Sequence, residues 1–168
     1  PIALGADLVI LSLTKYLAGH NDVIAGAVLG RCQMVAPIRE YHGTIGTLLP
    51  PLAAYLIIRG IKTAALRMEQ HNRTAEKVAL FLERHPKVRR VYYPKLLSHP
   101  AHAVASRILK GCGGVVSFRL KSDLRRAEAF LDRLRLFKIA PSLGGVESLA
   151  ELVATMSFWD KTRAERHK

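Results

Sequence analysis

The stretch Ser12-Leu13-Thr14-Lys15-Tyr16-Leu17-Ala18-Gly19-His20-Asn21-Asp22 decides how the first part of this chain folds and where its chemistry lies. It follows the run Asp7-Leu8-Val9-Ile10-Leu11, which is short, apolar and partly β-branched, so we expect a buried strand there. In open α/β sheets, ligands gather at the carboxyl ends of strands. Ser12 and Thr14 stand two residues apart, so an extended chain would turn both hydroxyls to one side, with Lys15 directly after them.

One lysine beside two hydroxyls suits an aldehyde cofactor that carries a phosphate. A lysine amine in a desolvated pocket loses its proton more readily and can form a Schiff base with a carbonyl. The hydroxyls of Ser12 and Thr14 could donate hydrogen bonds to phosphate oxygens, and pyridoxal phosphate supplies both groups. The alternative is that Lys15 is an ordinary solvated lysine after a strand, and this short motif alone does not separate the two readings.

Beyond this stretch, strands alternate with helices, which predicts an α/β or α+β second domain. Pro50 and Pro51 stand where a helix can begin. From there a long amphipathic helical pattern runs toward Arg84, and the His85-Pro86 pair ends it. We expect strands at 8–12, 23–29, 88–93 and 115–120, helices at 103–109 and 124–134, and a loop over 16–22 that turns at Gly19.

The composition argues against several classes of protein. Cys32 and Cys112 are far apart and lack CxxC spacing, which indicates free thiols of a cytosolic protein and no disulfide framework. His20 stands in a loop and the other histidines have no ligand spacing, so we expect no metal. The apolar run 48–58 is interrupted by prolines and too short to span a bilayer, so we expect no membrane partner.

The net charge of +13 is unevenly distributed and is the one feature that suggests another class of function. Basic and acidic residues balance over 1–58, so the whole excess begins at Arg59. Such a surface attracts polyanions. The basic residues alternate with apolar helical positions, as in 121–138, with no compact arginine-rich run and no aromatic RNA-binding motif. We therefore expect a solvated basic face and no nucleic-acid partner.

Further motifs stand before, within and after the lysine segment in a fixed order, and together they cover nearly the whole chain. They are Leu4-Gly5-Ala6-Asp7-Leu8, Gly19-His20-Asn21-Asp22-Val23, Tyr55-Leu56-Ile57-Ile58-Arg59-Gly60-Ile61-Lys62-Thr63, His85-Pro86-Lys87-Val88, Val91-Tyr92-Tyr93-Pro94, Ser98-His99-Pro100, Gly113-Gly114-Val115-Val116-Ser117-Phe118 and Ser142-Leu143-Gly144-Gly145-Val146-Glu147-Ser148-Leu149. The set closely resembles the Cys/Met-metabolism, or transsulfuration, family of pyridoxal phosphate-dependent enzymes.

The resemblance implies roles for individual residues. Lys15 would carry pyridoxal 5'-phosphate as the catalytic base and acid, and Ser12 and Thr14 would bind its phosphate. Ser142 would contact the carboxylate of an amino-acid substrate. Without the resemblance, Ser142 would be interpreted as a serine that begins a turn. We expect Glu147 and Ser148 to hold that turn together.

The resemblance also implies an α/β chain of fold type I, the PLP-dependent transferase-like fold. Residues 1–60 would be the C-terminal part of the large cofactor domain, and 61–168 most of the smaller C-terminal domain. We expect a fragment, because an aspartate, a stacking aromatic residue and a phosphate loop of the family would precede Pro1, and a carboxylate-binding arginine would follow Lys168. A homo-oligomer built as a dimer of dimers and a cytoplasmic location are expected, with an upstream targeting peptide left open.

Within the family, three segments resemble the plant-type cystathionine gamma-synthase branch. They are Gly19-His20-Asn21-Asp22, Ala140-Pro141-Ser142 and Met156-Ser157-Phe158-Trp159-Asp160. That branch joins an activated homoserine ester to cysteine by gamma-replacement. The alternatives are carbon-sulfur bond cleavage by cystathionine beta- or gamma-lyase or methionine gamma-lyase, and, from another class, a non-catalytic basic fragment that binds polyanions.

Overall fold

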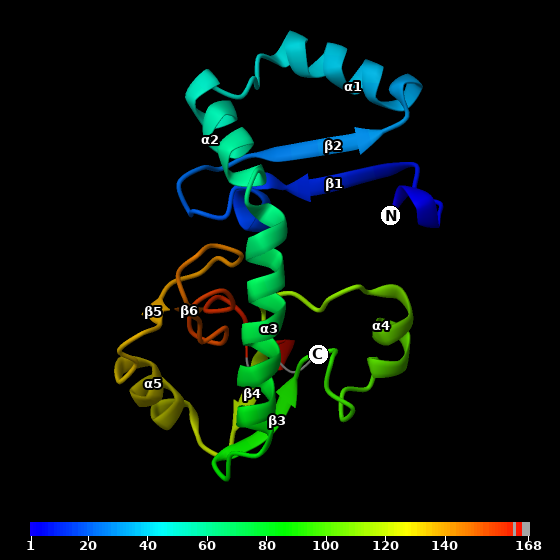
Figure 1. Ribbon diagram of the computed structural model, residues 1–168. Coiled ribbons are helices and arrows are strands. Elements are labelled where there is room, and N and C mark those ends of the chain that lie inside the picture. The colour runs from blue at the N-terminus through cyan, green and yellow to red at the C-terminus, as the bar shows by residue number, and fades with distance from the viewer. Residues whose placement is uncertain (163, 166–168) are drawn as a thin grey trace. The chain divides into compact units, whose positions relative to one another are not determined.

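The computed structural model describes residues 1–162 and 164–165, and it divides the chain into two units, Pro1–Arg67 and Met68–Lys168. Their elements are shown in Figure 1. The predicted division of the family's domains at residue 60 falls in the same helical region, and it stays a prediction.

The first unit is built on an antiparallel pair of strands. β1 (Leu8–Ser12) pairs with β2 (Gly26–Gly30) along its whole length, as Figure 1 shows. The strand predicted at 8–12 is confirmed, and the one predicted at 23–29 starts later. The delay has a local cause: the backbone of Ala25 hydrogen-bonds to the turn that follows β1, so it is not part of the ladder.

β1 is not buried, contrary to the prediction. One face of the strand pair is uncovered within this unit, where Ile10 is 81% exposed, and the nearby Ile24 is 90% exposed. The apolar run identified a strand correctly, but a pair of strands without a covering layer on that face cannot bury it. The unit's buried hydrophobic residues are instead Ala18, Val23 and Ile57, which form one cluster.

Three helices follow β2 along the chain, and the third continues into the second unit. α1 (Cys32–Ile45) was not predicted, and α2 (Pro51–Ile61) begins at the predicted proline pair. The single long helix expected to run on to Arg84 is wrong, because α2 ends and α3 (Ala64–Glu83) starts anew after Lys62 and Thr63. The predicted stop before His85-Pro86 is confirmed. No helix among residues 1–162 and 164–165 is long and apolar enough to cross a membrane.

The break between α2 and α3 has a clear hydrogen-bonding cause. The carbonyl oxygen of Gly60 accepts from the backbone N–H of Thr63 at 3.2 Å and from the Thr63 hydroxyl at 3.3 Å. It also accepts from Nη2 of Arg67 at 2.8 Å. A carbonyl that bonds three residues ahead tightens the last turn of a helix. These bonds therefore end α2 and redirect the chain.

The second unit alternates strands and helices as predicted. β3 (Val88–Tyr92) pairs antiparallel with β4 (Ser117–Leu120), and a two-residue parallel pair, β5 (Lys138–Ile139) with β6 (Leu149–Ala150), follows later. The predicted helices correspond to α4 (His102–Ile108) and α5 (Leu124–Asp132), each ending earlier than expected. The β5–β6 pair was not predicted, because two residues carry no readable alternation.

The core of this unit lies between α3 and the β3–β4 pair. Its buried members are Ala75, Ala79, Val88, Val91, Tyr93 and Leu96. The small alanines on α3 allow the helix to approach the strands closely, and Tyr93 is the largest side chain that is fully buried. This apolar cluster gives the second unit a core of its own.

Candidate functional site

Lys15 lies in a short helical turn directly after β1. The turn, η2 (Leu13–Leu17), is of the π type, and at Lys15 the backbone leaves helical values, with φ −87° and ψ −127°. The side chain is half-buried. We call residues 12–19, from the last residue of β1 through Gly19, the lysine turn. Its place at the carboxyl end of a strand agrees with the position predicted for a ligand site, although the strand is one of an antiparallel pair.

The hydroxyl of Thr14 is engaged by the backbone of Ala25. Thr14 Oγ1 accepts from the Ala25 N–H at 2.9 Å and donates to the Ala25 carbonyl oxygen at 3.2 Å. The same oxygen accepts from the backbone N–H groups of Leu13 and Thr14. The predicted reason for a phosphate role, alternation along a strand, is therefore wrong. Thr14 has left the strand, and its single hydroxyl proton is donated to Ala25, the residue before β2.

Ser12 is the residue whose hydroxyl remains available. It is the last residue of β1, it is exposed, and it makes no side-chain cap to the turn that follows. A serine hydroxyl offers one donated proton and two acceptor lone pairs. Of the two hydroxyls predicted to bind phosphate, Ser12 is thus the one placed to donate.

Arg67 holds the far side of the lysine turn. Its Nη1 donates to the carbonyl oxygen of Tyr16 at 2.6 Å, and its Nη2 donates to that of Leu17 at 3.1 Å. The guanidinium also donates to Gly60 and, through Nε, to the hydroxyl of Thr63 at 3.1 Å. Burial lowers the pKa of this guanidinium from its ordinary value, without making it neutral. One cation therefore joins the end of the lysine turn to the end of α2.

Two glycines permit this close approach. A Cβ on Gly60 would strike the carbonyl group of Ala18, and a Cβ on Gly19 would strike the guanidinium of Arg67. Gly19 also has φ +70°, so its predicted role as the residue that turns the loop is confirmed. The lysine turn, α2 and Arg67 meet through backbone groups, and side chains at these two positions would separate them.

His20 is hydrogen-bonded within the loop. Its Nδ1 lies 2.7 Å from the carbonyl oxygen of Ala18, which can only accept, so this nitrogen carries the proton. The next residue, Asn21, has φ +55°, a left-handed conformation that asparagine tolerates better than most residues. Across the part of the chain that the structure describes, no group of three or more His, Cys, Asp and Glu side chains could hold a metal ion.

Ser142 belongs to the second unit and not to the lysine turn. It lies in the loop between β5 and β6, whose base is closed by Lys138 N–H donating to the Ser148 carbonyl at 2.9 Å. Ser142 is exposed and has φ +120°, a conformation that is unusual for a residue with a side chain, and Gly144 has φ +82°. This backbone hydrogen bond holds the loop at its base, and the prediction that Glu147 and Ser148 hold the turn together stays a prediction. The substrate role of Ser142 stays a prediction.

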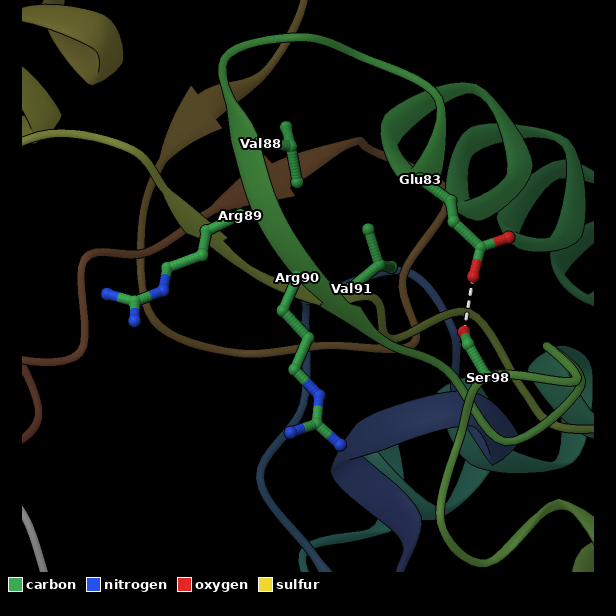
Figure 2. A pocket seen from close by; sticks show the side chains of 6 residues that line it. All are labelled: Glu83, Val88, Arg89, Arg90, Val91 and Ser98. Atoms are coloured by element: carbon green, nitrogen blue, oxygen red, sulfur yellow. Dashed lines mark hydrogen bonds between the residues drawn. The ribbon is translucent and has the colours of Figure 1, made fainter.

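A pocket of about 230 Å³ lies beside β3 and is shown in Figure 2. Its lining comprises Glu83, Val88, Arg89, Arg90, Val91 and Ser98, which include none of the predicted site residues. Ser98 donates to Glu83, which ties the chain after β3 to the end of α3. A β-bulge between Val88 and Arg90 explains why two consecutive arginines face outward. This pocket is a structural junction and does not extend the lysine site.

Sequence reasoning missed the supports of the lysine turn. Arg67 is 51 residues from Tyr16 and 50 from Leu17, and Ala25 is 11 residues from Thr14. No local spacing announces such contacts. The only signal in the sequence was Gly60, a glycine inside an apolar helical pattern, which often marks a close approach of two backbones.

Comparisons with known proteins place this arrangement in one class. The family model described as "Cys/Met metabolism PLP-dependent enzyme" matches residues 1–168. The chain belongs to this family, whose members are pyridoxal phosphate-dependent transsulfuration enzymes. The predicted family is confirmed.

Curated relatives and solved structures with similar sequences are named as cystathionine synthases and lyases. Cystathionine gamma-synthase 1, chloroplastic, of Nicotiana tabacum is 52% identical over 99% of this chain and 31% of its own length. Cystathionine beta-lyase of Coxiella burnetii is 46% identical over 100% of this chain and 44% of its own length. The crystal structure of cystathionine gamma synthase from Xanthomonas oryzae pv. oryzae "in complex with aminoacrylate and cysteine" matches with a TM-score of 0.94 and 39% identity, over 99% of this chain and 43% of that one.

These matches confirm the predicted fold class, α/β of fold type I. The chain spans less than half the length of each of these relatives.

The residues of the lysine turn fit the family's cofactor. Pyridoxal phosphate requires an amine for its aldehyde and donors for its phosphate, and this turn offers Lys15 and the exposed hydroxyl of Ser12 at the end of one strand. Thr14, bonded on both sides to Ala25, fixes the backbone between them.

Proposed function

We propose that this protein is a transsulfuration enzyme of the cystathionine gamma-synthase type, which joins an activated homoserine ester to cysteine by gamma-replacement. The observation that carries the proposal is the lysine turn, with Lys15 and Ser12 on a backbone fixed from both sides. The 52% identity to the tobacco gamma-synthase supports this branch over the others.

Four residues would have distinct roles in this reaction, three of them in the lysine turn. Lys15 would hold pyridoxal phosphate and, once the substrate amine has replaced it, take a proton from the substrate Cα with its Nζ and return protons along the carbon chain. Ser12 would donate to a phosphate oxygen, while Thr14 keeps the turn against Ala25. When bound, pyridoxal phosphate supplies an electron sink for the carbanions of this chemistry. Ser142 would receive the substrate carboxylate.

Modification of a single lysine tests the cofactor site. The protein is mixed with pyridoxal phosphate and reduced with borohydride, and the labelled peptide is identified by mass spectrometry. We expect the label on Lys15 and its loss in Lys15→Ala, with Lys62→Ala, an exposed lysine after α2, as the matched control. Label scattered over surface lysines, unchanged in Lys15→Ala, would overturn the proposal.

The lyases are the second candidate chemistry, because cystathionine gamma-lyase of Sus scrofa and the Coxiella beta-lyase are both 46% identical to this chain. The full-length gene product would be assayed in parallel with a homoserine ester plus cysteine and with cystathionine alone. Formation of cystathionine from the first mixture supports the synthase. Release of cysteine or homocysteine from cystathionine alone, without the first reaction, would assign a lyase.

A basic module that binds polyanions is the competing function from another class, and the net charge of +13 is its only support. Binding to a nucleic acid would weaken steeply with salt and would not change in Lys15→Ala. If the protein is the proposed enzyme, the label depends on Lys15 and no such binding occurs.

We further propose small amino-acid substrates, a homo-oligomer built as a dimer of dimers and a cytoplasmic location. Gel filtration would test the oligomer, and cell fractionation would test the location.

A further inference from the structure

Arg67 donates to four acceptors in two segments that are distant in the sequence. Two are carbonyl oxygens of the lysine turn, at Tyr16 and Leu17, and two belong to the α2–α3 junction, at Gly60 and Thr63. A guanidinium has five N–H groups in a fixed fork, so four of its five donors are used here. Hydrogen bonds from a charged donor are the stronger ones.

Ala25 and Arg67 hold the backbone on the two sides of Lys15. Before the lysine, the Ala25 carbonyl accepts from the N–H groups of Leu13 and Thr14. After it, Arg67 binds the two carbonyls that a continuing helix would have satisfied. The backbone on both sides of Lys15 is therefore fixed, although Lys15 itself departs from helical geometry.

We propose that Arg67 is a positioning residue for Lys15: through the carbonyls of Tyr16 and Leu17 it sets the direction in which the lysine amine is presented. The proposal rests on the function proposed above only for the identity of the group that Lys15 holds. A reactive side chain that is fixed before its partner binds needs no reorganisation when it reacts. Arg67 touches neither cofactor nor substrate in this scheme.

The experiment compares Arg67→Gln, Arg67→Lys and Arg73→Gln in the full-length gene product. Glutamine removes the charge and most of the donors, while lysine keeps the charge with three donors and no fork. Arg73 is an exposed arginine on the same helix, where it pairs only loosely with Glu69 at 4.0 Å, so its variant controls for the loss of an arginine from α3.

The first measurement is amide hydrogen exchange of the peptide that contains residues 13–20, without added cofactor. We expect exchange about tenfold faster or more in Arg67→Gln, an intermediate rate in Arg67→Lys and the wild-type rate in Arg73→Gln. The second is the rate of borohydride-trapped labelling of Lys15 by pyridoxal phosphate, which should follow the same order. In steady state, kcat should fall with KM for the amino acid little changed.

The outcomes separate this proposal from the proposed function. A wild-type protein whose Lys15 takes no label contradicts the proposed function, and the exchange data still decide whether Arg67 fixes the turn. If Arg67→Gln labels Lys15 at the wild-type rate, or exchanges at the wild-type rate over 13–20, the positioning role is wrong. Faster exchange with slower labelling in Arg67→Gln, partly restored in Arg67→Lys and absent in Arg73→Gln, supports it.

Discussion

The two units of this chain are stabilised in different ways. In Pro1–Arg67, three buried residues form the core, and the lysine turn is held by hydrogen bonds from Ala25 and Arg67. In Met68–Lys168, α3 and the β3–β4 pair enclose a larger apolar cluster around Tyr93. The unit that contains the lysine turn therefore depends on a few directional polar contacts, whereas the other unit depends on buried area.

The two kinds of contact respond differently when the backbone moves. Apolar packing tolerates small shifts of backbone, because its free energy follows the area buried. Hydrogen bonds weaken steeply when geometry changes, and each partner left unsatisfied carries a desolvation penalty. The lysine turn is therefore precisely placed but vulnerable, and the exposed Ile10 and Ile24 show how little burial supports it within its own unit.

Truncation of Tyr93 should have the largest effect on stability and should act mainly on the second unit. The side chain is 1% exposed, and its hydroxyl donates to the Gly113 carbonyl at 3.0 Å. Loss of a large buried aromatic side chain costs about 3–5 kcal/mol, so Tyr93→Ala should lower the free energy of unfolding by that amount. Urea denaturation measures the total, and hydrogen exchange of peptides from each unit locates it.

Tyr93→Phe is the matched control, because it keeps the ring and removes one hydrogen bond worth about 1 kcal/mol. Exchange that rises equally in residues 8–30 and in 75–96 after Tyr93→Ala would contradict the comparison, since it would mean that the two units unfold together.

A methyl group at Gly60 should damage the first unit. Its Cβ would strike the carbonyl group of Ala18 in the lysine turn, and a backbone contact cannot yield as a flexible side chain can. Overpacking of this kind costs about 1–3 kcal/mol, so Gly60→Ala should lower stability and speed exchange over residues 13–20.

Gly43→Ala is the control with the opposite expected sign. Gly43 lies inside α1 with nothing near its Cβ position, so alanine there should stabilise by about 0.5–1 kcal/mol through helix propensity. Equal effects of the two substitutions would show that the contact between Gly60 and Ala18 has no energetic weight.

Local signals in the sequence predicted the frame of the molecule. The apolar run before Ser12 identified β1, the proline pair at 50–51 identified the start of α2, and His85-Pro86 identified the end of α3. Each of these signals lies in adjacent residues and acts through backbone sterics or side-chain pattern. The family resemblance, confirmed by the match over 1–168, added the prediction that Lys15 holds the cofactor.

The features that could not be predicted depend on contacts between residues that are far apart in the sequence. The partner of the Thr14 hydroxyl, the carbonyls bound by Arg67 and the break after α2 all arise from contacts that spacing does not encode. α1 was missed for another reason. It contains Pro37 and Gly43 and has no buried residue, so neither propensity nor an apolar stripe indicates a helix there.

The helix cap at Asp123 offers a smaller test within the second unit. Asp123 Oδ1 accepts from the Arg126 N–H at 3.0 Å at the start of α5. Removal of an N-cap costs about 0.5–2 kcal/mol, so Asp123→Ala should destabilise by that amount and loosen α5 alone. Asp132→Ala makes the same chemical change at the other end, where a carboxylate opposes the helix dipole, and should be neutral or slightly stabilising. Loosening of the lysine turn by Asp123→Ala would contradict the independence of the units.

The smallest expected effect is a change in local order with pH near the end of the described chain. The Glu165 carboxylate accepts from the N–H and the hydroxyl of Thr162, at 2.8 and 2.7 Å, in the pattern of a capping box. These hydrogen bonds lower the pKa of Glu165 below its ordinary value, and the bond from the hydroxyl has the larger effect. Because the folded-state pKa is the lower one, the cap is fully present above the ordinary glutamate value of about 4.3 and is lost as the pH falls through the lowered pKa.

An NMR titration of the Glu165 side chain and the Thr162 amide would follow this loss. The midpoint should lie below the ordinary glutamate value. Thr162→Val removes the hydroxyl and keeps the shape of the side chain, so the midpoint should rise toward the ordinary value. An unchanged midpoint would show that the hydroxyl of Thr162 does not hold the carboxylate in solution. Because the cap is exposed, its loss should leave exchange in the apolar core around Tyr93 and in the lysine turn unchanged.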